Sequence, residues 1–361
     1  MRNMSVTFLE PSGSNLLTAD IPQTSRNLKL TVTRNNAPWI NSNYPEAVGA
    51  YGTNLSLAEY GYYVNQQRVK GDAEIFYSHT NHTGKTLKFR IHIYNCSAST
   101  VTVKRTNMGY SSGWTTPADA VKGYFAGNGQ NFTLASGASA WLTPEYSITG
   151  NGNTPFTGMV HFNASDDIIV TEYMYYNASA VKGTEKAYPF NTNSKVYTGI
   201  GTGYFITFNH KSAAADRTKV SSLAKQPYIY TVNDPDINFT NNNEMVPIKI
   251  LGTNETAQVG GSYGNIGNWG AHNYHVIKFT NDTSQKAVIY GYIASNLNSG
   301  NTQVINRGGV IKSARLNRDT GKRQWKWCKV ELNPGQSEEF DFQQIVASYG
   351  DAASVMKWEL E

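Results

Sequence analysis

The chain has 361 residues, a length typical of two domains. Charged residues make up only 16% and hydrophobic residues 39%, which excludes a highly charged disordered protein and is unusual for a cytosolic enzyme. The missing charge is replaced by 37 Asn, 34 Thr and 28 Ser, beside 23 Tyr and 32 Gly. This mixture favours strands and turns over helices, so the composition predicts an all-β protein.

The net charge of +5 is spread thinly along the chain. The only basic cluster comprises Lys322, Arg323, Lys326 and Lys329, so nucleic acid is not an expected partner. No apolar stretch is long enough to span a bilayer. With two cysteines, Cys96 and Cys328, a disulfide-dense scaffold is excluded. One disulfide between them stays open as an alternative, but we expect two unpaired, half-buried thiols.

Strand patterns recur from one end of the chain to the other. Between Leu87 and Ile93, apolar residues alternate with polar ones, as in a strand with one buried face. One short helix is expected at residues 117–125, with Thr116 as its cap and Pro117 at its first position. Further strands are predicted at residues 28–33, 74–79, 100–104, 159–162, 168–175, 204–208, 276–280, 287–293, 325–332, 338–342 and 355–360.

The two halves of the chain share an order of parts. In each half an Asn-initiated turn joins two strands, at Asn95 and at Asn281. A Leu-x-x-Gly-x-Ser turn, starting at Leu134 and at Leu332, then joins two more. We therefore predict two tandem antiparallel β-sandwich domains of immunoglobulin-like type, at residues 60–187 and 188–361, after an N-terminal arm and lead-in segment at residues 1–59.

Several segments resemble a known family. They are residues 73–81 with Gly84, 87–103, 120–125, the Leu-x-x-Gly-x-Ser turn, 267–270, the strand from Tyr274, and 307–309. They are similar to the two-domain β-sandwich region of secreted Gram-positive surface proteins that often carry a copper amine oxidase N-terminal (stalk) module. The resemblance implies display outside the cell on a Gram-positive envelope, and it supplies no known catalytic site.

The sequence shows no complete set of catalytic residues in a recognisable arrangement. Copper amine oxidases make their cofactor from a Tyr in an Asn-Tyr-Asp/Glu setting, but Tyr44 and Tyr274, which follow Asn, precede Pro and His. The Gly-x-Ser-x-Gly pattern occurs at residues 109–113 and 260–264, but no His and acidic residue stand in a recognisable local setting that would make either serine a nucleophile. The acid pairs 166–167 and 338–339 are interpreted as solvated charges, because adjacent strand residues face opposite sides. We therefore expect a protein that is not an enzyme.

Two patterns raise the question of a metal. His79 and His82, like His272 and His275, are three residues apart, a spacing that suits a ligand pair on a helix. These pairs lie at a strand end and at a loop-to-strand junction, so we interpret them as ordinary exposed or turn histidines. Asp234, Asp236 and Asn238 place oxygen atoms at alternate positions, as Ca²⁺ loops do, but turn propensity explains them equally well. No other cofactor is expected.

The leading hypothesis is a non-enzymatic structural protein of the bacterial cell or spore surface that assembles into a homo-oligomer, fibre or lattice. Low charge leaves sheet edges poorly guarded against pairing. The N-terminal arm is rich in strand formers, and it is either tied to its own domain or added as a strand to a neighbour. Its self-association candidates are Val6, Phe8, Leu28, Leu30 and Val32.

The alternative is a carbohydrate-binding surface module that recognises wall polysaccharide or exopolysaccharide. Aromatic side chains at alternate strand positions can form a platform for sugar rings. The candidates are Tyr173, Tyr175, Trp325 and Trp327. Cross-strand packing within a sheet gives the same pattern, so both interpretations stay open.

Overall fold

The computed structural model describes residues 6–21, 31–43, 47–49, 55, 61–113, 116–150, 152, 154–176, 186–187, 198–213, 216–232, 269–295, 300–347 and 354–361. The protein is all-β, as predicted, and the chain divides into two compact units. Unit 1 comprises Met1–Asn35, Phe205–Asn238 and Ile266–Glu361. Unit 2 comprises Asn36–Tyr204 and Phe239–Asn265.

These units differ from the predicted domains at the N-terminus. Residues 1–35 were expected to precede both domains, yet they belong to unit 1 with the C-terminal half of the chain. Residues 36–59 and 188–204 belong to unit 2. The cause is strand pairing over long sequence distances, which local patterns do not reveal.

Unit 2 is built on one eleven-stranded sheet with the order β10-β7-β12-β6-β4-β14. The other strands branch from this path: β11 pairs with β7, β5 and β13 with β6, β8 with β12, and β9 with β8. The strands are β4 (Pro38–Ser42), β5 (Ala47–Val48), β6 (Tyr62–Asn81), β7 (Leu87–Asn95), β8 (Val101–Ser112), β9 (Gln130–Leu134), β10 (Ser139–Trp141), β11 (Tyr146–Ile148), β12 (Pro155–Tyr175), β13 (Lys186–Ala187) and β14 (Thr198–Thr202).

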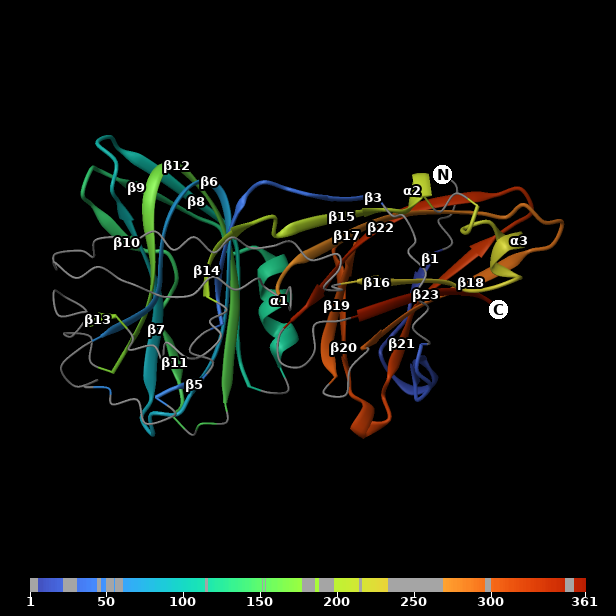
Figure 1. Cartoon of the computed structure of the whole chain (residues 1–361), viewed down its shortest axis with the longest axis horizontal. Coiled ribbons are helices and arrows are strands. Elements are labelled where there is room, and N and C mark those ends of the chain that lie inside the picture. The colour runs from blue at the N-terminus through green and yellow to red at the C-terminus, as the bar shows by residue number, and fades with distance from the viewer. Residues whose placement is uncertain are drawn as a thin grey trace. The chain divides into compact units, whose positions relative to one another are not determined.

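Two long antiparallel strands, β6 and β12, join the layers of unit 2 (Figure 1). Along its other edge, β12 pairs with β8 over residues 156–164 and with β7 over residues 168–175. An irregularity between Ala164 and Ile168 separates the two halves. Because such irregularities bend a strand, one strand serves both layers of the sandwich.

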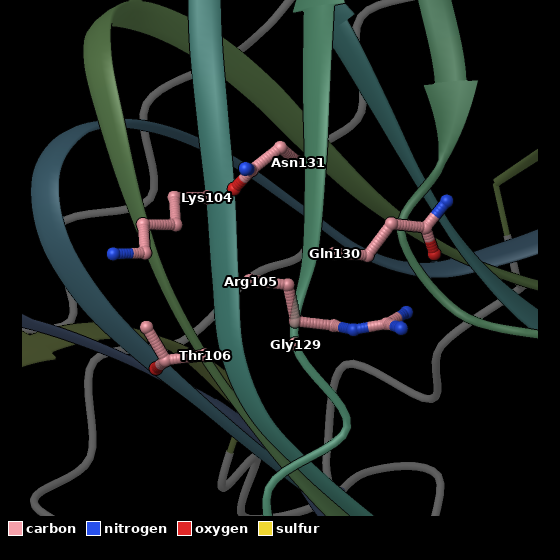
Figure 2. A pocket seen from close by; sticks show the side chains of 6 residues that line it. All are labelled: Lys104, Arg105, Thr106, Gly129, Gln130 and Asn131. Atoms are coloured by element: carbon pink, nitrogen blue, oxygen red, sulfur yellow. The ribbon is translucent and has the colours of Figure 1, made fainter.

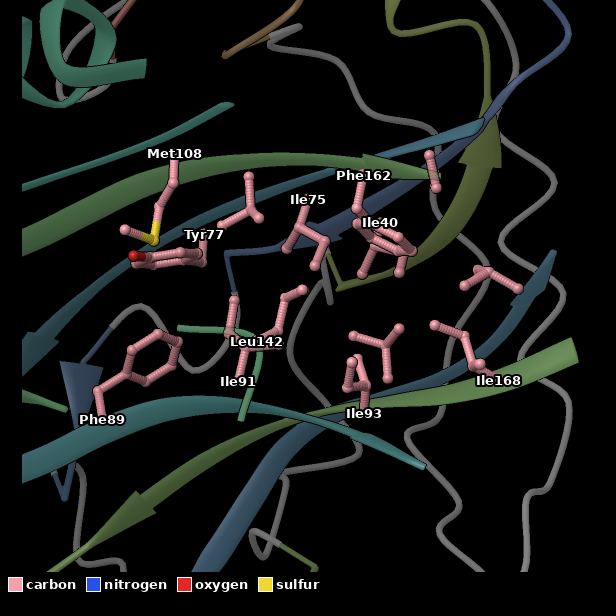
Figure 3. Packing of buried hydrophobic residues seen from close by; sticks show 14 of the residues in the cluster. Ile40, Ile75, Tyr77, Phe89, Ile91, Ile93, Met108, Leu142, Phe162 and Ile168 are labelled. Atoms are coloured by element: carbon pink, nitrogen blue, oxygen red, sulfur yellow. The ribbon is translucent and has the colours of Figure 1, made fainter. Parts of the chain in front are cut away.

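The core of unit 2 lies between these layers. Figure 3 shows Ile40, Ile75 and Phe162 from one layer facing Ile91 and Ile93 from the other. Each of these side chains is at most 1% exposed. The alternation along residues 87–93 thus marks a strand with its apolar face in the core, as predicted.

Unit 1 contains two six-stranded sheets. Sheet A has the order β1-β21-β18-β23-β16, with β2 also on β21, and sheet B has the order β20-β19-β22-β17-β15-β3. The strands are β1 (Val6–Phe8), β2 (Leu16–Leu17), β3 (Thr31–Arg34), β15 (Phe205–Asn209), β16 (Tyr228–Val232), β17 (His272–Thr280), β18 (Ala287–Ser295), β19 (Asn301–Arg307), β20 (Val310–Leu316), β21 (Gln324–Leu332), β22 (Ser337–Val346) and β23 (Ser354–Leu360). Two four-residue helices, α2 (His210–Ala213) and α3 (Val220–Leu223), were not predicted.

The internal repeat has a structural basis in unit 2, where Asn95 holds two turns together. Its side-chain Nδ2 donates to the carbonyl oxygens of Ser99 at 2.7 Å and Leu134 at 2.9 Å. Its Oδ1 accepts from the backbone N–H of Ser97 at 2.9 Å. The side chain therefore bonds its own turn and the Leu-x-x-Gly-x-Ser turn at once, and we call this arrangement an asparagine corner.

Unit 1 contains the equivalent corner at Asn281. The Nδ2 atom donates to the carbonyls of Gln285 at 2.7 Å and Leu332 at 3.1 Å, and Oδ1 accepts from the N–H of Thr283 at 3.1 Å. Asn81 forms a third corner with the same bonding pattern. Each of the three asparagines is completely buried, so the corner supplies partners to polar groups that water does not reach.

The predicted helix is α1 (Pro117–Ala126) in unit 2. Its predicted side-chain cap is wrong, since the Thr116 hydroxyl forms no capping hydrogen bond and instead lies 2.9 Å from the Ser111 hydroxyl. The helix packs closely on β8: a Cβ atom at Gly109 would lie 1.7 Å from the carbonyl oxygen of Ala120. No helix in the described part of the chain is both long and apolar enough to cross a lipid bilayer.

Candidate functional site

Strand β9 is an outer strand of the unit 2 sheet. Among the described residues it pairs only with β8. Phe132 and Leu134 face the core, whereas Thr133 and the other polar side chains are exposed. The strand contains no charged residue and no proline, the features that usually keep an edge from pairing with another chain. Within the described residues β9 therefore ends the sheet, and an uncharged edge of this kind favours strand addition.

An open depression of about 470 Å³ lies along β8 and β9. Figure 2 shows Lys104 and Thr106 on one side of β8 and Arg105 on the other. The lining residues are Lys104, Arg105, Thr106, Gly129, Gln130 and Asn131. Amides, a hydroxyl and two cations line it without a carboxylate, so it suits hydrogen bonding to a polar surface.

Arg105 fixes the start of β9. Its Nε donates to the carbonyl oxygen of Asn128 at 2.9 Å, and its Nη1 donates to the carbonyl oxygen of Leu142. Burial lowers the pKa of the guanidinium, which stays charged at neutral pH. Asn128 also donates to the carbonyl oxygen of Met108, at 3.2 Å. These bonds hold the loop before β9, so the edge strand begins in a defined position.

A chain of polar side chains starts at Thr106 on the outer face of the sheet. The Thr106 hydroxyl lies 2.5 Å from His161 Nδ1, and His161 Nε2 lies 2.8 Å from Asp72 Oδ1 and 3.0 Å from the Tyr204 hydroxyl. The order hydroxyl, imidazole, carboxylate is that of a nucleophilic triad. Here the Asp72 side chain is 45% exposed and Tyr204 shares the nitrogen, so the arrangement does not isolate an activated nucleophile.

Glu74 lies beneath helix α1 and is completely buried. The Tyr124 hydroxyl of the helix donates to Glu74 Oε2 at 3.0 Å. Burial raises the pKa of the Glu74 carboxyl well above its usual value, and the pKa of the Tyr124 phenol rises for the same reason. Their hydrogen bond joins the helix to β6.

A second buried polar cluster occupies the interior of unit 2. Glu172 on β12 accepts a hydrogen bond from Asn65 Nδ2 at 3.4 Å. It also accepts a side-chain hydrogen bond from Ser42. The Ser42 hydroxyl lies 3.2 Å from His79 Nε2. Burial raises the pKa of the Glu172 carboxyl to about 8. Each of these four side chains is at most 1% exposed, so they are closed to a substrate.

The histidine pairs differ from the prediction. His79, His272 and His275 are buried, so their interpretation as exposed or turn residues is wrong, and only His82 is exposed. His272 and His275 lie on one strand, three positions apart, and their side chains therefore face opposite sides of the sheet. His275 instead contacts His210, 65 residues away. Desolvation lowers the pKa of His210 to about 3 and that of His275 well below its usual value.

Other candidate sites have different outcomes. In the described part of the chain, no group of three or more His, Cys, Asp or Glu side chains is placed to hold a metal ion. Asp234, Asp236 and Asn238 lie outside the described residues, so the Ca²⁺ loop stays a prediction. Both cysteines are free, as predicted, but Cys328 is completely buried rather than half-buried.

The predicted aromatic platform is wrong. Tyr173, Tyr175, Trp325 and Trp327 are at most 2% exposed, so none of them can stack on a sugar ring. Tyr173 packs edge-on against Trp141, and Trp327 packs edge-on against Trp358. Among the described residues only Tyr176 and Val310 are large hydrophobic side chains with high exposure.

The N-terminal arm pairs within its own chain. Val6 pairs with Val330 and Phe8 with Cys328, which makes β1 part of sheet A. Val32 on β3 pairs with Phe208 on β15 of sheet B. Of the two arrangements that the sequence leaves open, these strands adopt the one tied to their own domain. Leu28 and Leu30 lie outside the described residues.

Unit 1 also has a sheet edge without charge. In the described part of the chain, β16 pairs only with β23, and it contains no charged residue and no proline. By contrast, the outer strand β20 carries Lys312 and Arg315. Lys312 Nζ donates to the carbonyl oxygen of Phe8 at 2.8 Å and pairs with Glu10 at 2.6 Å. Each unit thus has at least one edge that lacks charged residues.

No known protein family and no curated protein matches the chain. Among solved structures it is similar to the PBSX exported protein XepA, with 9% identity over 85% of this chain and 88% of that one, at a TM-score of 0.19. It is also similar to a CBM22 tandem from Paenibacillus barcinonensis Xyn10C, with 10% identity over 85% of this chain and 92% of that one, at a TM-score of 0.15. A Penaeus vannamei nodavirus protein is 8% identical over 77% of this chain and 83% of that one, at a TM-score of 0.16. Likeness at these TM-scores carries no inference about function.

Proposed function

We propose that this chain is a non-enzymatic structural protein that assembles with copies of itself through the uncharged edges of its sheets. The proposal is carried by two edge strands without charge or proline, β9 in unit 2 and β16 in unit 1, each paired on one side only among the described residues. An exposed, uncharged edge presents N–H and C=O groups that another strand satisfies.

Two different edges on one chain favour an open assembly. If β9 of one molecule pairs with β16 of the next, the contact is head-to-tail, and such a contact propagates unless its rotation closes a ring. A fibre or lattice is the expected product. The resemblance of the sequence to Gram-positive surface proteins supports a location outside the cell, on the cell or spore surface.

A matched pair of lysine substitutions tests the role of β9. Thr133 on β9 and Thr102 on β8 are cross-strand partners, and both are exposed. Thr133→Lys places a charge on the edge strand, whereas Thr102→Lys places the same charge on an inner strand. Sedimentation velocity and negative-stain microscopy at rising concentration would follow assembly.

We expect the unmodified chain to form concentration-dependent assemblies, Thr133→Lys to shift them toward monomer, and Thr102→Lys to assemble normally. A chain that stays monomeric at every concentration contradicts self-association. Equal assembly by both variants contradicts the role of β9 and leaves β16 to be tested with Ile229→Lys, on the β16 edge.

A further inference from the structure

Four ring side chains meet in the interior of unit 1. His210 begins α2, Tyr228 and Tyr230 lie on β16, and His275 lies on β17. Because β16 belongs to sheet A and β17 to sheet B, the cluster lies between the two layers. Each of the four side chains is at most 5% exposed. We call it the imidazole–tyrosine cluster.

Two polar atoms of the cluster lie at the same distance from His275 Nδ1. His210 Nε2 lies 3.3 Å from His275 Nδ1, and the Tyr230 hydroxyl lies 3.3 Å from the same His275 nitrogen. An imidazole nitrogen carries either one proton or one lone pair, so His275 Nδ1 cannot form a good hydrogen bond with both neighbours. Both distances are also long for hydrogen bonds between such groups.

The same distances suit coordination. Ligands bound to zinc tetrahedrally at about 2.0–2.1 Å are separated from one another by roughly 3.3–3.4 Å. We propose that His210 Nε2, His275 Nδ1 and the Tyr230 oxygen form a three-ligand site for a divalent transition metal of the zinc type. Imidazole nitrogens are ligands that zinc, copper and nickel prefer, which separates this site from a Ca²⁺ or Mg²⁺ site.

The surroundings hold the proposed ligands in place. The Tyr228 hydroxyl lies 2.9 Å from His210 Nδ1, the kind of outer hydrogen bond that orients a metal-binding imidazole. The His275 ring is stacked on Phe208 and on Phe342, with centroids 4.7 and 4.6 Å away and interplanar angles of 15° and 8°. The hydrogen bond orients the His210 ring, and the stacking fixes the plane of the His275 ring, whose Nε2 has no hydrogen-bond partner in the described part of the chain.

Binding balances with the loss of one proton. The Tyr230 phenol gives up its O–H proton when its oxygen bonds the metal, and the two neutral imidazoles contribute lone pairs without losing a proton. One divalent ion therefore replaces one proton in the cluster. Proton release is measurable by calorimetry in buffers of different ionisation enthalpy.

The test uses the full chain, stripped of metal with a chelator and then titrated with zinc. His275→Phe removes the nitrogen and keeps a ring between Phe208 and Phe342, and Tyr230→Phe removes only the oxygen. His272→Phe is the matched control, since His272 is buried on the same strand with its ring near Phe205. Mass spectrometry counts bound metal, calorimetry gives affinity and proton release, and the cobalt form reports geometry by its visible absorption.

We expect one zinc per chain, one proton released, an intense tetrahedral cobalt band and a raised melting temperature. His275→Phe should abolish binding, Tyr230→Phe should weaken it at least tenfold and end proton release, and His272→Phe should bind normally. Absence of stoichiometric zinc in the unmodified chain overturns the proposal. Unchanged binding by a folded His275→Phe variant overturns it too, because the ion then lies elsewhere.

Discussion

Replacing Glu172 with glutamine should change how stability depends on pH. The Glu172 carboxyl is completely buried, and burial raises its pKa to about 8 from an ordinary value of 4.5. Glutamine has nearly the same shape, and its amide can accept from Asn65 and donate to the Ser42 hydroxyl. The substitution therefore removes the titration while it keeps the packing.

The magnitude follows from the two pKa values. Below pH 4.5 the carboxyl is protonated in the folded and unfolded chains alike, and its contribution to stability is fully present. As the pH rises, the unfolded chain loses the proton first, so the folded state loses stability until the pH passes about 8. The loss is about 3 kcal/mol between pH 4 and pH 7, with about 1.4 kcal/mol more by pH 9.

Urea unfolding at several pH values between 4 and 9 would measure this effect as the difference between Glu172→Gln and the unmodified chain. Taking the difference cancels the titration of all other groups. Glu331→Gln is the control, because that exposed carboxylate pairs with Lys286 and Lys329, which lower its pKa. The reasoning is refuted if the Glu172→Gln difference stays flat while the variant remains folded.

Three further predictions concern the corners, the helix and the arm. Asn95→Ala and Asn281→Ala should each lower the free energy of unfolding by about 2 kcal/mol, because the buried carbonyl of Leu134 or Leu332 loses its donor. Exposed Asn131→Ala should cost less than about 0.5 kcal/mol in urea titrations. Gly109→Ala should cost about 3 kcal/mol, since helix α1 has no room for a Cβ, and an unchanged melting temperature would contradict that packing. Deleting residues 1–34 removes β1, β2 and β3 and so exposes the edges of β21 and β15 with which they pair. Light scattering should then show more aggregation, and a stable monomer would contradict the idea that these strands protect the sheet edges.

Local alternation was enough to predict many strands but not their lengths. The sequence predicts separate strands at residues 159–162 and 168–175, yet both belong to β12, which continues through the irregularity after Ala164. Asn163 and the acidic residues after it are typical of a turn, so their local signal indicates a break. Pairing with β6 along nearly its whole length is what keeps the strand continuous.

Site prediction failed where partners are distant in the sequence. The sequence pairs His275 with His272, because spacing is the only signal that it offers. Its actual neighbour, His210, is set by the parallel pairing of β15 with β17, which no short pattern encodes. Similarly, the alternation of Trp325 and Trp327 fits a surface platform and a core strand equally well. Both side chains are buried on β21 of sheet A, so they belong to the core.

The asparagine corners bear on how the protein is produced. Asn81, Asn95 and Asn281 each begin an Asn-x-Ser/Thr tripeptide, the acceptor sequence of N-linked glycosylation in eukaryotic secretion. A glycan would attach to the same Nδ2 atom that donates to two carbonyls inside the folded corner. A nascent chain that was glycosylated there before folding could not close its corners. Expression in a bacterial cytoplasm keeps that nitrogen available.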